Sequence, residues 1–465
     1  MKYYENKNIT LYHGDNNDEM KVIPNDSIDL IVTDPPYGIT FMGKQWDIKV
    51  PSIEIWKECL RTLKPGAFTF IMSSPRQDVL SEMIYNIRHA GFDTNFTSIY
   101  WTYASGFPKA MNIGKAIDKR FGTEREVIGK NTKADSTYYT NNVGGSIIST
   151  QTYNITKPTS EKAKEFDGSY AGFQPKPAVE IIIVAMKPLS EKSFIDQALN
   201  NGKGITWLDD CRLPYQSDGD KESAILGGKI TTKDSNAGIG AVVGGINNIE
   251  LDKEQWIKEK QIGRFPANLL VSDDILNDGN ITKTGICNPE KNKKNSESFF
   301  GKYKDTNFIG YDISGGDSGS FSRYFDLDKW FNETIKKLPE DVQKVFPFLI
   351  VSKAAKSERN EGCDDTKLQQ VNDGRNIPPD NAFQRGITLR HNFHPTVKPL
   401  KLISYLITLG SRPKDVILDP FVGSGTTCIS ANMIGRKSIG IEINEDYINI
   451  AKSKIIEVSK QVRFT

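Results

Sequence analysis

The sequence predicts an α/β protein in which both ends of the chain form one doubly wound sheet around a large irregular insertion. In the N-terminal part, apolar strand-like runs at about 28–33, 67–73 and 96–102 alternate with segments whose apolar residues recur at helical spacing. In the C-terminal part, an apolar strand, a glycine turn, a helix-like segment and a second strand follow one another over residues 416–442. Between these parts, from about 188 to 345, the chain is polar, glycine-rich and without regular rhythm.

The elements of the N-terminal part follow from their hydrophobic patterns. The run 28–33 suits a buried strand, and apolar residues three or four positions apart over 53–63 and 79–90 predict two amphipathic helices. The apolar run 179–186, closed by Lys187-Pro188, predicts a further strand. The segment 131–172 is rich in Ser, Thr, Asn, Gly and Tyr and predicts a mobile loop, because it can bury little apolar surface.

The length of 465 residues suggests roughly three domain-sized units, or one large domain with a long insert. We place the divisions at 1–187, 188–345 and 346–465, so that the two outer parts are halves of one sheet domain.

A tetrapeptide, Asp34-Pro35-Pro36-Tyr37, directly follows the strand-like run 28–33. The two prolines fix φ near −65°, and Pro35 also keeps Asp34 out of helical space, so the chain leaves the strand extended and stiff. The Asp34 carboxylate and the Pro35 carbonyl could then accept both hydrogens of one exocyclic NH₂ group, while Tyr37 offers a flat face to its heterocycle. This pattern indicates the catalytic site of an amino-group methyltransferase; the alternative is a rigid proline turn that only closes a buried strand.

A glycine turn follows the strand that ends at Asp419. Gly423 and Gly425 let the backbone approach a ligand closely, and Glu442, at the end of the next strand, is placed to accept hydrogen bonds from a ribose diol. NAD is one candidate ligand, but the turn lacks the third glycine of dinucleotide sites, and Asp419 would repel a phosphate while suiting the ammonium of a methionyl group. The turn therefore favours S-adenosylmethionine. The other turn residues that we assign to the cofactor are Phe421, Ser424 and Thr426.

Together these two segments resemble the β-class DNA amino-methyltransferases of the N4/N6 family, in which catalytic motifs precede, and cofactor motifs follow, a central target-recognition segment. Further matches are Leu11–Asp15, Leu63–Gly66 and His394–Pro399. The stretches 101–109, 176–180, 263–268 and 352–360 are similar to the phage and prophage adenine-N6 branch of that family.

The resemblance implies a Rossmann-like methyltransferase sheet with an inserted recognition region at 188–345. It adds Asp15, Thr396 and Lys398 to the expected cofactor site, and it pairs the 179–186 strand with the 96–102 strand in antiparallel fashion. It also implies double-stranded DNA as partner, with the target base flipped out and stacked on Tyr37. Trp101 or Tyr103 could cover the other face of the base, although an aromatic residue on a strand is more often part of the core.

The expected reaction is site-specific methylation of adenine N6 in DNA. Cytosine-N4 members of the resembling family usually carry serine where this chain has Asp34, but both bases present an NH₂ next to a ring nitrogen, so Asp34 alone does not exclude cytosine. An N4-cytosine enzyme of the same class is therefore the nearest rival, and methylation of RNA or of a protein amide is more distant. A catalytically silent nucleic-acid-binding module that keeps the fold is a rival of a different class. A homodimer and a cognate restriction enzyme stay open as partners.

The composition limits where nucleic acid could bind. The chain has 60 Lys and Arg against 58 Asp and Glu, a net charge of +2, so any nucleic-acid surface must be a local patch such as Lys291, Lys293 and Lys294. The five cysteines and four histidines show no metal-ligand spacing, and we expect no metal and reduced cysteines. With no apolar signal core and no run near the ~20 residues of a membrane span, we expect a cytoplasmic protein of a prokaryotic or phage-infected cell.

Overall fold

The computed structural model describes residues 1–39, 45–103, 110–134, 150–173, 178–215, 263–272, 282–283, 318–319, 325–338, 363, 369–371, 388–390 and 397–461. Some residues singled out from the sequence lie outside these ranges. They are Thr396, Lys291, Lys293, Lys294, the stretch 352–360, and parts of the stretches 101–109, 131–172, 176–180 and 394–399.

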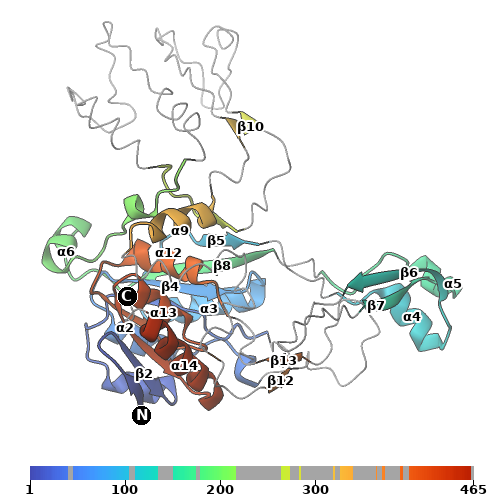
Figure 1. The fold of residues 1–465 in the computed structure, drawn as a ribbon, viewed down its shortest axis with the longest axis horizontal. Helices are drawn as coiled ribbons and strands as arrows, with labels where there is room; N and C mark the ends of the chain where they lie inside the picture. Colours follow the sequence, from blue (N-terminus) through green and yellow to red (C-terminus); the bar gives the residue numbers. More distant parts are fainter. Residues whose placement is uncertain are drawn as a thin grey trace, which may run out of the picture.

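A nine-stranded sheet forms the centre of the molecule (Figure 1). Its order is β1-β2-β15-β14-β3-β4-β8-β5-β9. The strands are β1 (Lys2–Glu5), β2 (Ile9–His13), β3 (Leu30–Thr33), β4 (Phe68–Ser73), β5 (Ile99–Thr102), β8 (Val179–Met186), β9 (Leu269–Val271), β14 (Val416–Asp419) and β15 (Lys437–Glu442). Two-stranded pairs are formed by β6 (Glu126–Ala134) with β7 (Thr150–Lys157), β10 (Thr282–Lys283) with β11 (Ser318–Gly319), and β12 (Gln369–Val371) with β13 (Thr388–Arg390).

Most helices associated with the sheet come from the two ends of the chain, and α9 comes from the middle part. They are α1 (Asn16–Glu19), α2 (Ile53–Thr62), α3 (Gln77–His89), α9 (Leu327–Ile335), α12 (Leu400–Gly410), α13 (Thr426–Met433) and α14 (Glu445–Gln461). The other helices within the described residues are α4 (Ile113–Phe121), α5 (Glu161–Glu165), α6 (Phe194–Asn201) and the short 3-10 helices Met20–Val22, Gln45–Asp47 and Leu208–Cys211.

The strand order confirms the predicted doubly wound sheet. From β14 the chain passes through α13 to β15 on one side, and from β3 it passes through α2 to β4 on the other. Strands β14 and β3 are themselves parallel neighbours, with Leu418 opposite Ile31. Their carboxyl ends therefore meet where the winding direction reverses, which is the position at which open α/β sheets bind ligands.

Alternation along the central strands divides the core into two layers. Leu30 and Val32 of β3 pack on the side of α12, α13 and α14, whereas Ile31 packs with α2 and α3. Helix α12 is buried over its whole length, and a Cβ on its last residue, Gly410, would lie 2.6 Å from Leu30 Cδ1. The close approach of α12 to β3 fixes the N-terminal end of α12, and with it Lys398, relative to the end of β3.

Strand β8 lies between β4 and β5 and is antiparallel to both, as predicted for its pairing with β5. Because β5 then runs parallel to β4, the start of β8 reaches the edge of the sheet where β3 and β4 end. Glu180, second in β8 and opposite Trp101, is thereby brought to that edge.

The prediction of a loop over all of 131–172 is wrong where the structure describes this segment. Strand β6 extends to Ala134, β7 pairs with it, and α5 follows. Threonine and tyrosine favour strands, and an antiparallel hairpin needs only one covered face, so a segment with few apolar residues still pairs. Figure 1 shows this hairpin, together with α4 and α5, set apart from the central sheet.

The expected division at 188 and 345 stays a prediction, but two described elements inside it belong to the sheet domain. Strand β9 extends the central sheet beside β5, and Trp330 of α9 packs edge-on against Tyr405 of α12 with ring centroids 4.8 Å apart.

Candidate active site

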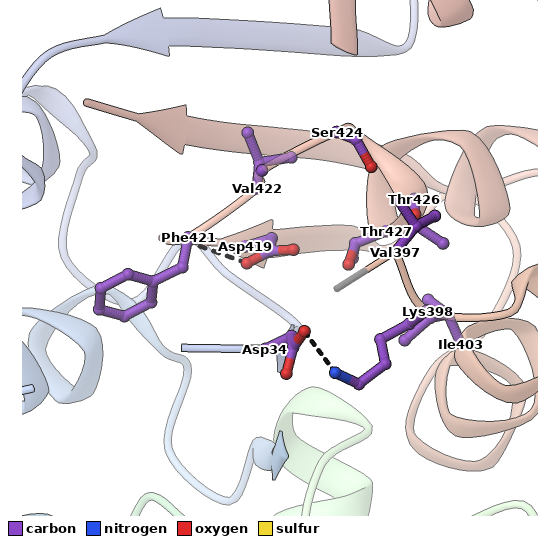
Figure 2. Close-up of a pocket in the computed structure, with 11 residues that line it drawn as sticks. Asp34, Val397, Lys398, Ile403, Asp419, Phe421, Val422, Ser424, Thr426 and Thr427 are labelled. Atoms are coloured by element: carbon purple, nitrogen blue, oxygen red, sulfur yellow. Dashed lines mark hydrogen bonds and ion pairs between the residues drawn. The ribbon is translucent and has the colours of Figure 1, made fainter. Parts of the chain in front are cut away.

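A pocket lies at the switch point, where β3 and β14 end (Figure 2). It encloses about 320 Å³, including the part that opens to solvent. Its walls come from the residue after β3, the start of α12 and the glycine turn. They comprise Asp34, Val397, Lys398, Ile403, Asp419, Phe421, Val422, Gly423, Ser424, Thr426 and Thr427.

The glycine turn has the conformation that its sequence predicts. Gly423 has φ 51° and Gly425 has φ 87°, a region that residues with a side chain rarely adopt. A Cβ on Gly425 would lie 3.1 Å from the Cβ and 3.2 Å from the Cα of Ala451 on α14. Gly425 is also the residue that precedes the first turn of α13. Glycine is therefore needed here both for the backbone angle and for the close packing of α14.

Asp419 ends β14 and is buried on the floor of the pocket, with 3% of its surface exposed. Its Oδ1 accepts hydrogen bonds from Thr33 Oγ1 at 2.7 Å and from the Phe421 amide at 3.0 Å. Burial raises the pKa of Asp419 to about 6, although the hydroxyls of Thr33 and Thr427 oppose the shift. The carboxylate is thus oriented by the protein but poorly stabilised as an anion.

Glu442 ends β15 and ties this strand to the glycine turn. The Gly423 amide donates to its Oε2 at 2.9 Å, and the Asn444 amide donates to its Oε1 at 2.8 Å. Burial nevertheless raises the pKa of Glu442 to about 7, more than these two amides compensate. The backbone fixes the carboxylate while leaving further lone pairs on both oxygens.

Asp34 holds two donors at once. The Tyr37 hydroxyl donates to Asp34 Oδ1 at 2.6 Å. The Lys398 ammonium donates to Asp34 Oδ2 at 2.6 Å, a contact that Figure 2 shows. Burial raises the pKa of Asp34, while the charge of Lys398 acts in the opposite direction. Burial alone would lower the pKa of Lys398, but Asp34 and Glu180 outweigh it, so the pKa of Lys398 is raised and the ammonium stays charged at neutral pH.

Two site residues were missed by the sequence reasoning. Buried Asp47 accepts the amides of Tyr37 at 2.6 Å and Gly38 at 3.0 Å, which fixes the chain after the prolines. Glu180 lies 3.3 Å from the Tyr37 hydroxyl and 3.4 Å from Lys398 Nζ. Asp47 carries no recognisable signal, whereas Glu180 ends the stretch 176–180 that resembles the adenine-N6 branch.

The remaining expected site residues divide into three groups. Pro35 is buried and Pro36 partly buried, and both follow Asp34 as expected. Asp15 is exposed and caps α1 by accepting the Asn17 amide at 2.9 Å, so its carboxylate is engaged outside the pocket wall. Thr396 lies outside the described residues. The Asn16 side chain, next to Asp15, donates to the Pro420 carbonyl at 3.1 Å and joins the end of β2 to the glycine turn.

The aromatic residues considered as a second cover for a base are core residues. Trp101 is 2% exposed and donates from Nε1 to Ser272 Oγ at 3.0 Å, and Tyr103 is 4% exposed. Ile99 and Trp101 of β5 are buried whereas Tyr100 on its other face is exposed, so Trp101 faces the core rather than a ligand.

The family model described as DNA methylase, for the N6/N4 methyltransferases, matches residues 28–453. This chain belongs to that DNA methylase family. The match includes the tetrapeptide, the pocket and the glycine turn.

Among curated proteins, a type II methyltransferase of Lactococcus lactis subsp. cremoris, M2.LlaDCHI, is 47% identical over 62 residues, which are 13% of this chain and 23% of that protein. The type II methyltransferase M2.DpnII of Streptococcus pneumoniae is 34% identical over 90 residues, 19% of this chain and 34% of that protein. The chain therefore matches about a quarter to a third of the length of these relatives.

Two solved structures align over most of the chain. The PvuII DNA methyltransferase, described as cytosine-N4-specific, is 12% identical with a TM-score of 0.40, covering 99% of this chain and 93% of its own. TTHA0409 of Thermus thermophilus, a putative DNA modification methylase complexed with S-adenosyl-L-methionine, is 14% identical with a TM-score of 0.34, covering 98% and 96%. These values are too low for the likeness to bear on fold or function.

Two features are absent from the part of the chain that the structure describes. No described helix combines the length and apolar composition of a membrane span. No group of three or more described His, Cys, Asp or Glu side chains is arranged to hold a metal ion.

Proposed function

We propose that this protein is a site-specific DNA methyltransferase that transfers a methyl group from S-adenosylmethionine to N6 of a flipped adenine. The observation that carries the proposal is the meeting of Asp34 and the glycine turn in one pocket at the switch point. An acceptor for an amine and a cradle for a nucleoside cofactor thus share one cavity.

The residues of the pocket fit this cofactor. In the pocket wall, Gly423 adds no side chain and the Asp419 carboxylate suits an ammonium group. Glu442 is not part of that wall but accepts the Gly423 amide, and its remaining lone pairs can accept hydrogen bonds from a ribose diol. When bound, S-adenosylmethionine supplies a methyl group that its sulfonium already activates for attack by an amine. The protein therefore has to orient the amine and keep water out of the pocket.

Asp34 and the Pro35 carbonyl act on the target amine. The N6 lone pair of adenine is delocalised into the ring, so the amine is a poor nucleophile. Two fixed acceptors that hold both N–H bonds favour the pyramidal nitrogen and stabilise the positive charge that develops on it. Tyr37, oriented through its hydroxyl and its amide, offers a ring for stacking of a base that has left the duplex.

Adenine is favoured over cytosine because the tetrapeptide begins with a carboxylate, a charge-assisted acceptor for an amine that gains positive charge. The proposal includes recognition of double-stranded DNA by residues within 188–345, and action in the cytoplasm of a prokaryotic or phage-infected cell. The type II relatives make a cognate restriction enzyme a reasonable partner to seek, and the homodimer stays an expectation of the resemblance.

Nucleoside analysis tests the proposal. The protein is incubated with unmethylated genomic DNA and S-adenosylmethionine, the DNA is digested, and the nucleosides are separated by mass spectrometry. We expect N6-methyladenine with the wild type and none with Asp34→Ala. N4-methylcytosine alone would overturn the base assignment, and no modified base with either protein would favour the silent binding module.

A further inference from the structure

Both oxygens of Asp34 are engaged by protein donors, Tyr37 and Lys398. A carboxylate paired with an ammonium is a weakened acceptor, and the ammonium itself repels the positive charge that develops on a target amine. For Asp34 to serve as the proposed acceptor, the charge of Lys398 must be drawn to another anion nearby.

Glu180 is that second anion. Its carboxylate lies 3.4 Å from Lys398 Nζ and 3.3 Å from the Tyr37 hydroxyl, so it is near both donors that Asp34 holds at 2.6 Å. Buried Tyr103 also hydrogen-bonds to Glu180, and β8 fixes the backbone of Glu180 between β4 and β5. Glu180 therefore sits on a rigid strand, close to the shared donors but outside the wall of the pocket.

We propose that Glu180 is a positioning residue that takes over Lys398, and with it the Tyr37 hydroxyl, when a target amine engages Asp34. The inference rests on the proposed function and deepens it. Once Lys398 pairs with Glu180, these two charges cancel locally, and Asp34 presents a full negative charge to the amine. When the amine leaves, Lys398 returns to Asp34 and compensates its buried charge.

A structure of Asp34→Asn tests the shared-donor arrangement without any methyl transfer. The substitution removes the charge of residue 34 with little change in size, so Lys398 Nζ should move to within hydrogen-bond distance of Glu180, about 3 Å. A Lys398 that stays on residue 34, or turns away from Glu180, would overturn the inference even if the protein methylates DNA.

Kinetics of Glu180→Gln and Glu180→Asp test the consequence for catalysis. We expect Glu180→Gln to lower kcat by about 10- to 100-fold, the loss of one charged hydrogen-bond partner, while calorimetry shows S-adenosylmethionine affinity within about twofold of wild type. Glu180→Asp, which keeps the charge, should recover part of kcat. Exposed Glu82→Gln on α3 is the matched control and should behave as wild type.

The outcomes separate this inference from the proposed function. Wild-type kcat in Glu180→Gln, or a loss that appears wholly in cofactor affinity, would refute a positioning role. If the wild type transfers no methyl group to DNA, the proposed function fails, and the Asp34→Asn structure alone decides whether Glu180 takes over Lys398.

Discussion

Three carboxylates, buried Asp419 and partly buried Asp34 and Glu442, lie near the switch point, and removal from water raises the pKa of each. Hydrogen bonds from backbone amides and hydroxyls fix their directions but do not fully replace water around their charges. A ligand that brings cationic or donor groups to these oxygens would relieve this cost, so the pocket is electrostatically prepared for such a ligand.

The raised pKa values predict that affinity for S-adenosylmethionine increases with pH. The pKa is about 6 for Asp419 and about 7 for Glu442, and a ligand that binds their ionised forms displaces protons. Affinity should therefore rise between about pH 5 and 8, by up to about tenfold per pH unit below the relevant pKa. Calorimetry at several pH values, in buffers of different ionisation enthalpy, measures both affinity and proton release.

Glu442→Gln is the control for this prediction. The glutamine side chain cannot ionise, so the variant should bind S-adenosylmethionine more weakly, and the pH dependence of its affinity near pH 7 should disappear. An affinity of the wild type that is constant with pH, without proton release, would contradict the assignment. The stability of the ligand-free protein should change in the opposite direction. Between about pH 4 and 7 the folded state holds more protons on these groups than the unfolded chain does, so their contribution to stability falls as pH rises.

Among the elements, the segment from β14 through the glycine turn and α13 to Glu442 is the one that the sequence predicted best. Its strand, turn, helix and acid are close together in sequence, so local rules predicted them, and the tetrapeptide was predictable for the same reason. Asp47 and Glu180 could not be found in this way, because Asp47 lies ten residues beyond Tyr37, outside the tetrapeptide, and Glu180 reaches Tyr37 across 143 residues through the tertiary fold. Lys398 was expected to hold cofactor, yet its ammonium contacts Asp34, a pairing across 364 residues that no local pattern encodes.

Gly425→Ala should destabilise the protein and weaken cofactor binding. The alanine backbone must adopt φ 87°, and its methyl group must lie 3.1 Å from Ala451 Cβ. We therefore expect the free energy of unfolding to fall by about 1–3 kcal/mol. Gly435→Ala is the matched control: its φ is 78°, but the nearest atom to a new Cβ is 4.0 Å away. Denaturant unfolding should show a larger loss for Gly425→Ala; equal losses would mean that packing against α14 contributes nothing.

On the scale of the whole molecule, the parts that could be predicted are the two ends, and the part that could not is the middle. The alternation of strands and helices in the doubly wound sheet follows from regular apolar runs, whereas the antiparallel pairing of β8 with β5 was expected from the family resemblance. Strand β9 and α9 were not predicted, because their apolar segments are short and become informative only once β5 and α12 offer surfaces to cover.

The lysine cluster 291, 293 and 294 gives a test of DNA contact by the insertion. In a chain with a net charge of only +2, neutralising these residues should weaken DNA binding and flatten its salt dependence, by about 0.9 in the log–log slope for each phosphate that the protein no longer neutralises. Cofactor affinity should be unchanged. Measurement of DNA affinity at several salt concentrations tests this, and an unaltered log–log slope would mean that the lysines are exposed to solvent and do not contact DNA.

The position of β14 and β15 in the sheet also has a consequence for how the chain folds. These late strands lie between β2 and β3, which are consecutive strands near the other end of the chain. The hydrogen bond from Thr33 to Asp419 joins residues that are 386 positions apart in sequence. Contacts of such long range are slow to form, because much of the chain must be ordered first. During synthesis, β2 and β3 each have an unpaired edge until nearly the whole chain has been made. Until then the incomplete chain exposes these strand edges, and it carries the risk of aggregation that unpaired edges bring.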